Sequence, residues 1–119
     1  MQGQRVKNIS YLCKAIFKLD AKTKELALLP AGSEVLSVNL EIITPLPNAV
    51  IDIGLAGKGD YFLDNINGGA KGFSQSSILL TSSSTQTINA TIANFDAKAD
   101  SLAILRVHYF LPSEVLVEC

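Results

Sequence analysis

The stretch of sequence that decides the fold runs from Leu29 to Leu63 and reads LPAGSEVLSVNLEIITPLPNAVIDIGLAGKGDYFL. It begins with a turn, continues as an alternating strand from Val35 to Ile43, and turns again at a proline-rich corner over 44–48. A second alternating strand over 49–55 leads into a glycine-containing loop. Alternation of apolar and polar residues is typical of half-buried strands. Proline marks a corner because it cannot donate a hydrogen bond to a neighbouring strand. The stretch therefore predicts a β-sandwich.

The strand from Val35 to Ile43 also predicts which of its side chains are buried. Successive side chains of a strand point to opposite faces of the sheet. One face is expected to enter the core and the other to meet water, as in antiparallel sheets with one wet face. The expected core face carries Leu36, Val38, Leu40 and Ile42, and the expected wet face carries Ser37, Asn39 and Glu41.

The rest of the chain continues this pattern, with polar turns at regular spacing. We expect a strand at 11–19 and a short strand or extended link at 25–29. A long glycine-rich loop over 54–72 is expected to contain one short strand or helical turn at 61–66. Further apolar strand positions lie at 78–80 and 88–92, and Pro112 is expected to end a last strand over 101–111. This amounts to about seven or eight antiparallel strands. The predicted fold is all-β, a single-domain, jelly-roll-like β-sandwich. A flexible N-terminal arm over residues 1–9 is expected to precede the sandwich domain over residues 10–119.

Composition narrows the class of protein. The chain has 119 residues, enough for one domain. Charged residues make up 18%, below the roughly 25% of average soluble proteins, which favours a surface partly covered by a partner. A monomer with a Ser/Thr surface is the alternative. A net charge of −1 offers no field for nucleic acid. No run approaches the roughly 20 apolar residues of a membrane span, and we expect no secretory signal.

Three patterns resemble chemical sites, and each lacks a specific requirement. The segment from Gly57 to Gly59 lacks the flanking residues of a phosphate loop. Asp60 and Asp64 lie near two asparagines without the spacing of a calcium loop, and Asx turns explain them. His108 is the only histidine, with no serine or cysteine near it in sequence. We therefore expect no enzymatic activity, no cofactor and no metal.

The N-terminal part of the chain is locally basic. Arg5, Lys7, Lys14 and Lys18 all precede the first acidic residue, Asp20. Such a run is either a solvated tail or an arm that docks on an acidic neighbour.

The two cysteines leave several states open. Cys13 lies on the apolar face of its predicted strand, where a buried free thiol is the usual state. Cys119 is the last residue, and it could reach Cys13 or a neighbouring subunit. Their spacing matches no metal motif. The pair is therefore a candidate disulfide, within one chain or between chains.

The order of the elements resembles a known family. A Leu29-Pro30-Ala31-Gly32 turn precedes a strand, and a second strand ends in an Ile53-Gly54 step and a loop of Gly59-Asp60-Tyr61-Phe62. A final alternating strand closes the chain. This order, over roughly residues 13–111, resembles the head decoration, or cement, proteins of tailed phages.

The resemblance implies a passive structural role. Such proteins form β-sandwich or jelly-roll trimers on the outside of icosahedral capsids, at threefold positions, where they bridge major capsid subunits. The resemblance implies a homotrimer that binds the major capsid protein and has no nucleic-acid or membrane partner. It also implies that the protein is in the host cytoplasm during assembly and on the exterior of the virion afterwards. Arg5 and Lys7 would be the residues through which the arm contacts the capsid. The alternative is a glycan- or receptor-binding module of a virion fibre or adhesin, with the Gly57–Gly72 loop as its binding surface.

The terminal cysteine yields a first test. If Cys119 forms an interchain bond, a non-reducing gel of the assembled particle shows a species larger than the monomer. Replacement of Cys119 by serine should abolish that species. Migration unchanged by the replacement leaves only the free-thiol or intrachain states.

Overall fold

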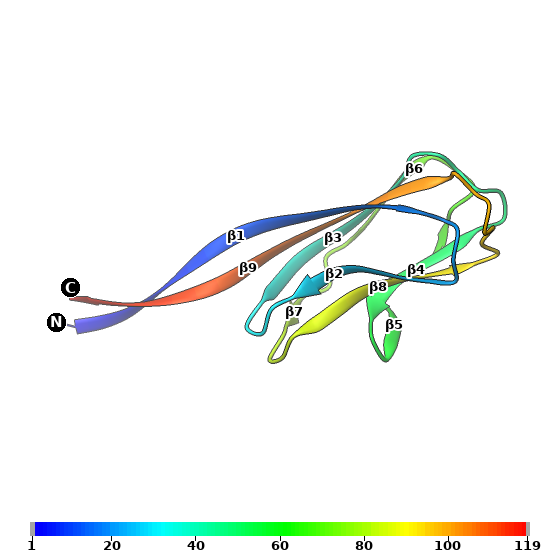
Figure 1. The fold of residues 1–119 in the computed structure, drawn as a ribbon. Helices are drawn as coiled ribbons and strands as arrows, with labels where there is room; N and C mark the ends of the chain where they lie inside the picture. Colours follow the sequence, from blue (N-terminus) through cyan, green and yellow to red (C-terminus); the bar gives the residue numbers. More distant parts are fainter. Residues whose placement is uncertain (1, 119) are drawn as a thin grey trace.

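The computed structural model describes the backbone of residues 2–118 and the side chains of residues 9–111, and this part of the chain is all-β (Figure 1). No helix in it is long and apolar enough to span a membrane. The nine strands are β1 (Gln2–Lys18), β2 (Thr23–Leu29), β3 (Glu34–Ile42), β4 (Val50–Leu55), β5 (Lys58–Asn67), β6 (Gly72–Ser76), β7 (Leu80–Thr81), β8 (Gln86–Ala93) and β9 (Leu102–Glu118).

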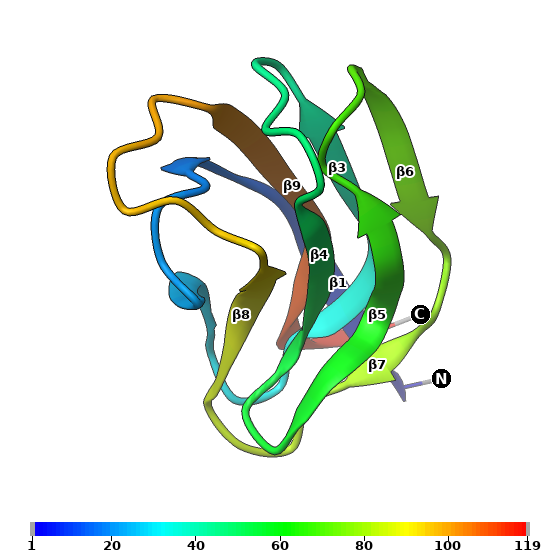
Figure 2. The same ribbon diagram turned by 90° about the vertical axis from the view of Figure 1, so that its right-hand side faces the viewer.

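The strands form two antiparallel sheets that face each other (Figure 2). Sheet A has the order β1-β9-β3-β6, with the short β7 also paired to β3, and sheet B has the order β2-β8-β4-β5. The first strand thus pairs with the last, β2 with β8, β3 with β6, and β4 with β5. This nesting of antiparallel pairs is the wrapping of a jelly roll. The predicted fold class is confirmed.

The core lies between the two sheets and is built from their inward-facing side chains. Its fully buried members are mostly β-branched or leucine side chains, which suit a half-buried pleated surface. The largest are Leu19, Leu29, Val35, Val38, Leu40, Ile51, Ile53, Ile88, Ile92, Leu105 and Val107.

The prediction that Leu36 belongs to the core face of β3 is wrong. Leu36 is exposed, whereas Val35 is fully buried. The register between β3 and β9 shifts between Val35 and Ser37, so Leu36 is the extra residue of a β-bulge. A bulge reverses which side chains face inward beyond it, and simple alternation cannot detect it.

The predicted long loop over 54–72 is also wrong. After a turn at Ala56 and Gly57, where Gly57 has φ +87°, the chain enters the ten-residue strand β5. This strand pairs with β4 through two register shifts, and Asn65 adopts a left-handed φ of 55°. Because these irregularities break the alternation, the segment resembles a loop in sequence. The binding loop proposed for the Gly57–Gly72 segment is therefore mostly an edge strand.

The end predicted for the last strand at Pro112 is wrong as well. β9 continues to Glu118, with Pro112 opposite Asn8 of β1. On its other side, β9 pairs with β3 only as far as Phe110. Past that point β9 has one free edge, and a proline is tolerated in a strand with a free edge because no donor is needed there.

The predicted turn before β3 is present and ties the two sheets together. Gly32 takes φ +90°, and the hydroxyl and amide of the buried Ser33 both donate to the carbonyl of Pro30, at 2.7 and 3.2 Å. The amide of Gly32 donates to the Ser82 carbonyl at 2.6 Å, and the Ser82 amide donates to the Ser33 carbonyl at 2.8 Å. The β2–β3 turn is thereby fixed to the β7–β8 turn.

The hairpin of β4 and β5 predicts a steep requirement for glycine at one position. A Cβ on Gly54 would overlap backbone atoms of Lys58 and Gly59, which cannot rotate away. Gly54→Ala should therefore lower the free energy of unfolding by about 2 kcal/mol or more in chemical denaturation. Gly59→Ala is the matched control, since its Cβ would lie 3.4 Å from Thr91 Oγ1. Equal stability of the two variants would contradict the close approach.

Candidate interaction surface

The most unusual feature of the molecule is a two-stranded ribbon. β1 and β9 pair along all 17 residues of each strand, from Gln2 opposite Glu118 to Lys18 opposite Leu102. β3 joins β9 only up to Phe110, so residues 2–9 and 111–118 have no third strand beside them. At about 3.3 Å per residue, this ribbon extends roughly 26 Å beyond the sandwich. Figure 1 shows it leaving the body, with both termini at its tip.

The N-terminal segment is thus a strand in the structure. β1 runs through residues 9 and 10 without a break. The mobility and the boundary expected for residues 1–9 stay predictions. Arg5 lies opposite Val115 and Lys7 opposite Ser113 in the ribbon register, and the side chains of both lie outside the described residues.

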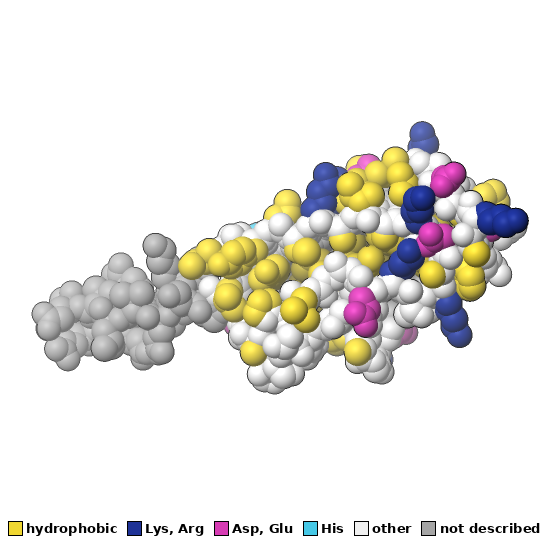
Figure 3. Space-filling model, viewed as in Figure 1, with side chains coloured by type: hydrophobic (Ala, Val, Ile, Leu, Met, Phe, Trp, Pro, Cys, Tyr) yellow, Lys and Arg dark blue, Asp and Glu magenta, His cyan; other side chains and the backbone are white. Residues whose placement is uncertain are grey.

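Apolar side chains surround the base of the ribbon. Tyr11 and Tyr109 lie directly opposite each other, with their rings stacked at 5.3 Å. The next inward-facing pair is Ile9, which is exposed, and Leu111, which is half-buried. Figure 3 shows hydrophobic side chains gathered where the ribbon joins the body. Burial raises the pKa of Tyr109, with smaller contributions from Cys13 and Tyr11. The inner face of β1 and β9 thus stays apolar as far as Ile9 and Leu111, one pair beyond the last residue of β9 that pairs with β3.

The outer face of sheet A carries further exposed apolar side chains. One row crosses the whole sheet from Ile16 through Ile104 and Glu41 to Phe73. Ile16 and Phe73, at its two ends, are strongly exposed. In the middle, Arg106 Nη1 donates to Glu41 Oε1 at 2.9 Å. The central charges of this face are therefore satisfied within the chain, and its unsatisfied apolar surface lies at the edges.

The outer face of sheet B is acidic along β4 and β5, whereas Leu28 of β2 is an exposed apolar residue of this sheet. Asp52, on β4, accepts the backbone amide of Asn65 at 2.7 Å. The pKa of Asp64 on β5 is raised, first by burial and then by the neighbouring Asp52 and Asp60. Lys58 Nζ is 4.0 Å from Asp60. Negative charge therefore accumulates along the β4–β5 side of the molecule.

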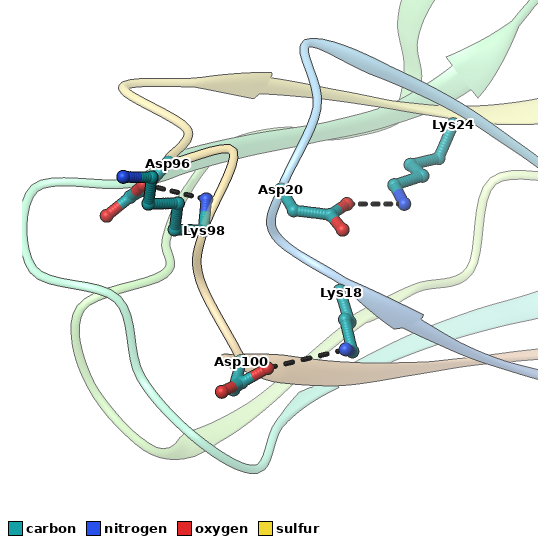
Figure 4. Close-up of polar contacts among 6 residues, drawn as sticks. All are labelled: Lys18, Asp20, Lys24, Asp96, Lys98 and Asp100. Carbon is teal, nitrogen blue, oxygen red and sulfur yellow. Dashed lines mark hydrogen bonds and ion pairs between the residues drawn. The ribbon is translucent and has the colours of Figure 1, made fainter.

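Two ion pairs lie at the end of the sandwich remote from the ribbon (Figure 4). Lys18 Nζ lies 3.4 Å from Asp100 Oδ1, and Lys24 Nζ lies 2.5 Å from Asp20 Oδ1. The hydrogen bond from Lys24 is the main cause that lowers the pKa of Asp20. Among the described residues, no three acidic, histidine or cysteine side chains are placed to hold a metal ion.

The fold makes one contact that sequence reasoning missed. Ser10 Oγ and His108 Nε2 are 2.7 Å apart, because β1 and β9 bring together residues that are 98 positions apart. The His108 ring also lies 5.2 Å from that of Phe110. Within the described residues, no carboxylate contacts His108, and the pair lies on an open sheet face. Only knowledge of the β1–β9 register could have revealed it, and it forms a surface hydrogen bond rather than a catalytic triad.

The two cysteines of the predicted disulfide are not both described. Cys13 is half-buried beside the core, opposite Val107. Cys119 lies outside the described residues. Glu118 pairs with Gln2, eleven residues along β1 from Cys13. This separation corresponds to roughly 36 Å at about 3.3 Å per residue. The register thus favours the interchain form of the bond, which stays a prediction.

The chain is similar to chains of three phage capsid structures. Neither the protein-family models nor the curated proteins contain a match. Among solved structures, a chain of the acidic stable capsid structure of Helicobacter pylori bacteriophage KHP30 is 31% identical, with a TM-score of 0.79 and 100% of both chains covered.

Two further similar structures are also phage capsids. A chain of the cyanophage Pam1 capsid is 21% identical, with a TM-score of 0.69, covering 88% of this chain and 86% of that one. A chain of the Ralstonia phage GP4 capsid is 13% identical, with a TM-score of 0.65, covering 90% of this chain and 86% of that one. At these identities the likeness shows a shared fold.

Proposed function

This chain belongs to the family of the KHP30 capsid chain, and from that premise we propose that it is a capsid decoration, or cement, protein. It is a structural protein of the virion. In the proposal it binds the outer capsid surface at threefold positions as a homotrimer, contacts the major capsid protein and stabilises the shell. It has no enzymatic activity, and it resides in the host cytoplasm until assembly.

The observation that carries this proposal is the β1–β9 ribbon. A two-stranded ribbon is marginally stable in water, because it has little hydrophobic surface to bury and two free edges. Here it extends from a base with exposed apolar side chains, Ile9 and Tyr11 among them. An element of this kind is expected to be covered by another protein. A capsid lattice, or the neighbouring subunits on it, supplies such a cover.

Symmetry explains how such a protein could strengthen a shell. Each copy offers one ribbon, so a trimer offers three. Weak contacts repeated around a closed ring act together, and the combined avidity exceeds that of one contact by orders of magnitude. This favours a role that depends on shape and repetition, which is consistent with a charged fraction of only 18%.

The proposal predicts that the basic residues of the ribbon contribute to capsid binding. Combined replacement Arg5→Glu and Lys7→Glu should weaken binding to shells assembled without this chain by roughly tenfold or more, as two charge contacts are reversed. Co-sedimentation of the purified chain with such shells measures the binding. Lys71→Glu, which changes an exposed lysine in the β5–β6 turn, is the single-charge control and should bind normally.

The outcomes separate the parts of the proposal. No binding of the unaltered chain to shells would refute the decoration role. Normal binding by the Arg5 and Lys7 double variant would refute the ribbon contact and leave the role itself intact. Cryo-electron microscopy of the decorated shell then locates the chain, and density away from the threefold positions or inside the shell would contradict the proposed placement.

A further inference from the structure

We propose that a groove at the end of the sandwich remote from the ribbon binds a neutral carbohydrate. The groove lies between the β3–β4 loop, residues 43–49, and the β8–β9 loop, residues 94–101. Figure 2 faces the end of the molecule that carries both loops. The volume of the groove is about 860 Å³, within the range of roughly 300–1,000 Å³ that is typical of small-molecule sites. The proposed decoration role does not use this part of the chain.

The lining of the groove combines one exposed aromatic ring with planar polar groups. It includes Leu46, Pro47, Asn48, Asn94, Phe95 and Asp96. Phe95 is 44% exposed, although phenylalanine is among the side chains that are most often buried. The lining thus offers an apolar ring, two amides and one carboxylate to a bound molecule.

Hydrogen bonds fix the two loops that form the walls of the groove. Asn94 Nδ2 donates to the carbonyl of Asn48 at 2.9 Å, which joins one loop to the other. Ser101 Oγ donates to the carbonyl of Pro45 at 3.0 Å and joins the two loops a second time. Both asparagines have left-handed backbones, with φ of 58° for Asn94 and 69° for Asn48, a conformation that asparagine tolerates better than most residues. The groove is therefore preformed by the fold.

The charge at the groove favours an uncharged ligand. Among the described residues that line it, Asp96 is the only one with a charged side chain. The Oδ1 atom of Asp96 accepts the backbone amide of Lys98 at 2.9 Å, which fixes the carboxylate. Lys98 itself is outside the lining. An anionic sugar, a phosphate or a nucleic acid would therefore meet a negative charge here, without a cation in the lining to balance it.

A carbohydrate is the uncharged ligand that uses all of these groups. The C–H bonds on one face of a pyranose ring pack against an aromatic ring, and Phe95 offers such a ring. Sugar hydroxyl groups both donate and accept hydrogen bonds, which suits the amide of Asn48 and the carboxylate of Asp96. Asn94 is a positioning residue, because its amide nitrogen holds the Asn48 carbonyl. An extended peptide fits less well, since it pairs with a strand edge and this groove is formed by loops.

The position of the groove agrees with a ligand outside the particle. The sequence suggested the Gly57–Gly72 segment as a glycan-binding surface, but that segment is mostly an edge strand. The groove lies instead at the end of the sandwich opposite the ribbon (Figure 1). In the proposed decoration role the ribbon contacts the shell, so the groove faces the medium and any glycans in it. This orientation rests on the proposed function, whereas the binding site itself does not.

An array that displays neutral and anionic glycans, probed with the full chain, tests the proposal. Neutral glycans should bind, and Phe95→Ala should lower their binding by roughly tenfold or more, because the stacking surface is removed. Phe95→Tyr keeps the ring and should bind like the wild type. Phe73→Ala is the matched control, since Phe73 is 70% exposed on β6 and outside the groove. Neither phenylalanine belongs to the buried core, so all three variants are expected to fold, which circular dichroism checks.

Nuclear magnetic resonance of the ¹⁵N-labelled chain locates the site. Titration with the terminal monosaccharide of the neutral glycan that binds most strongly should shift the amide signals of Asn48 and residues 94–96, and leave those of the ribbon in place. Four results would each overturn the proposal: no binding to any neutral glycan, binding to anionic glycans alone, equal binding by Phe95→Ala, or shifts away from the groove.

Shell binding separates this inference from the proposed function. Phe95→Ala should bind shells as the wild-type chain does, because the groove is remote from the ribbon. If the wild-type chain binds shells but no neutral glycan, the carbohydrate site is wrong and the decoration role stands. If it binds neutral glycans through Phe95 but no shells, the carbohydrate site stands and the decoration role is wrong. If Phe95→Ala fails to bind shells, the groove contacts the shell, and its assignment as a carbohydrate site is wrong.

Discussion

The pairing of the first strand with the last is the constraint on which the rest of this structure depends. β1 and β9 must find each other across almost the whole chain, and they pair in one continuous register from Gln2 opposite Glu118 to Lys18 opposite Leu102. Every other pair is nested inside this one, so closing it wraps the intervening strands into two layers. The same pairing continues beyond the sandwich, where it creates the ribbon and places both termini at its tip.

This constraint links the fold to the proposed role. Inside the sandwich, sheet B covers the inner face of β1 and β9, and residues such as Phe17 and Val107 are buried. Past Phe110, β3 no longer pairs with β9, while β1 and β9 continue to pair with each other. The chain therefore builds an element that its own core does not stabilise. In a capsid protein, surface left uncovered in this way is naturally explained by contacts with other subunits.

Alternation in the sequence was sufficient to predict β4, β8 and β3 from Ser37 onward, because the inward positions of these segments alternate and lie at the centre of the core. Alternation failed to predict the structure where a bulge or a register shift interrupts the regular pairing of the strands. The bulge at Leu36 exchanges the buried face, and the irregular pairing of β5 hides a strand within a glycine-rich segment. The extension of β9 beyond Pro112 depends on a free edge, and the Ser10–His108 contact depends on the β1–β9 register. Both are properties of the assembled sheet, which no local sequence window contains.

Hydrogen–deuterium exchange of the full chain, first as dilute monomer and then on the assembled particle, tests whether a partner covers the ribbon. We expect the amides of residues 2–9 and 111–118 to exchange quickly in the monomer and to become strongly protected on the particle. Core amides of β3 and β8 should be protected in both states and serve as the internal reference. Equal protection of the ribbon amides in monomer and particle would show that no partner covers the ribbon.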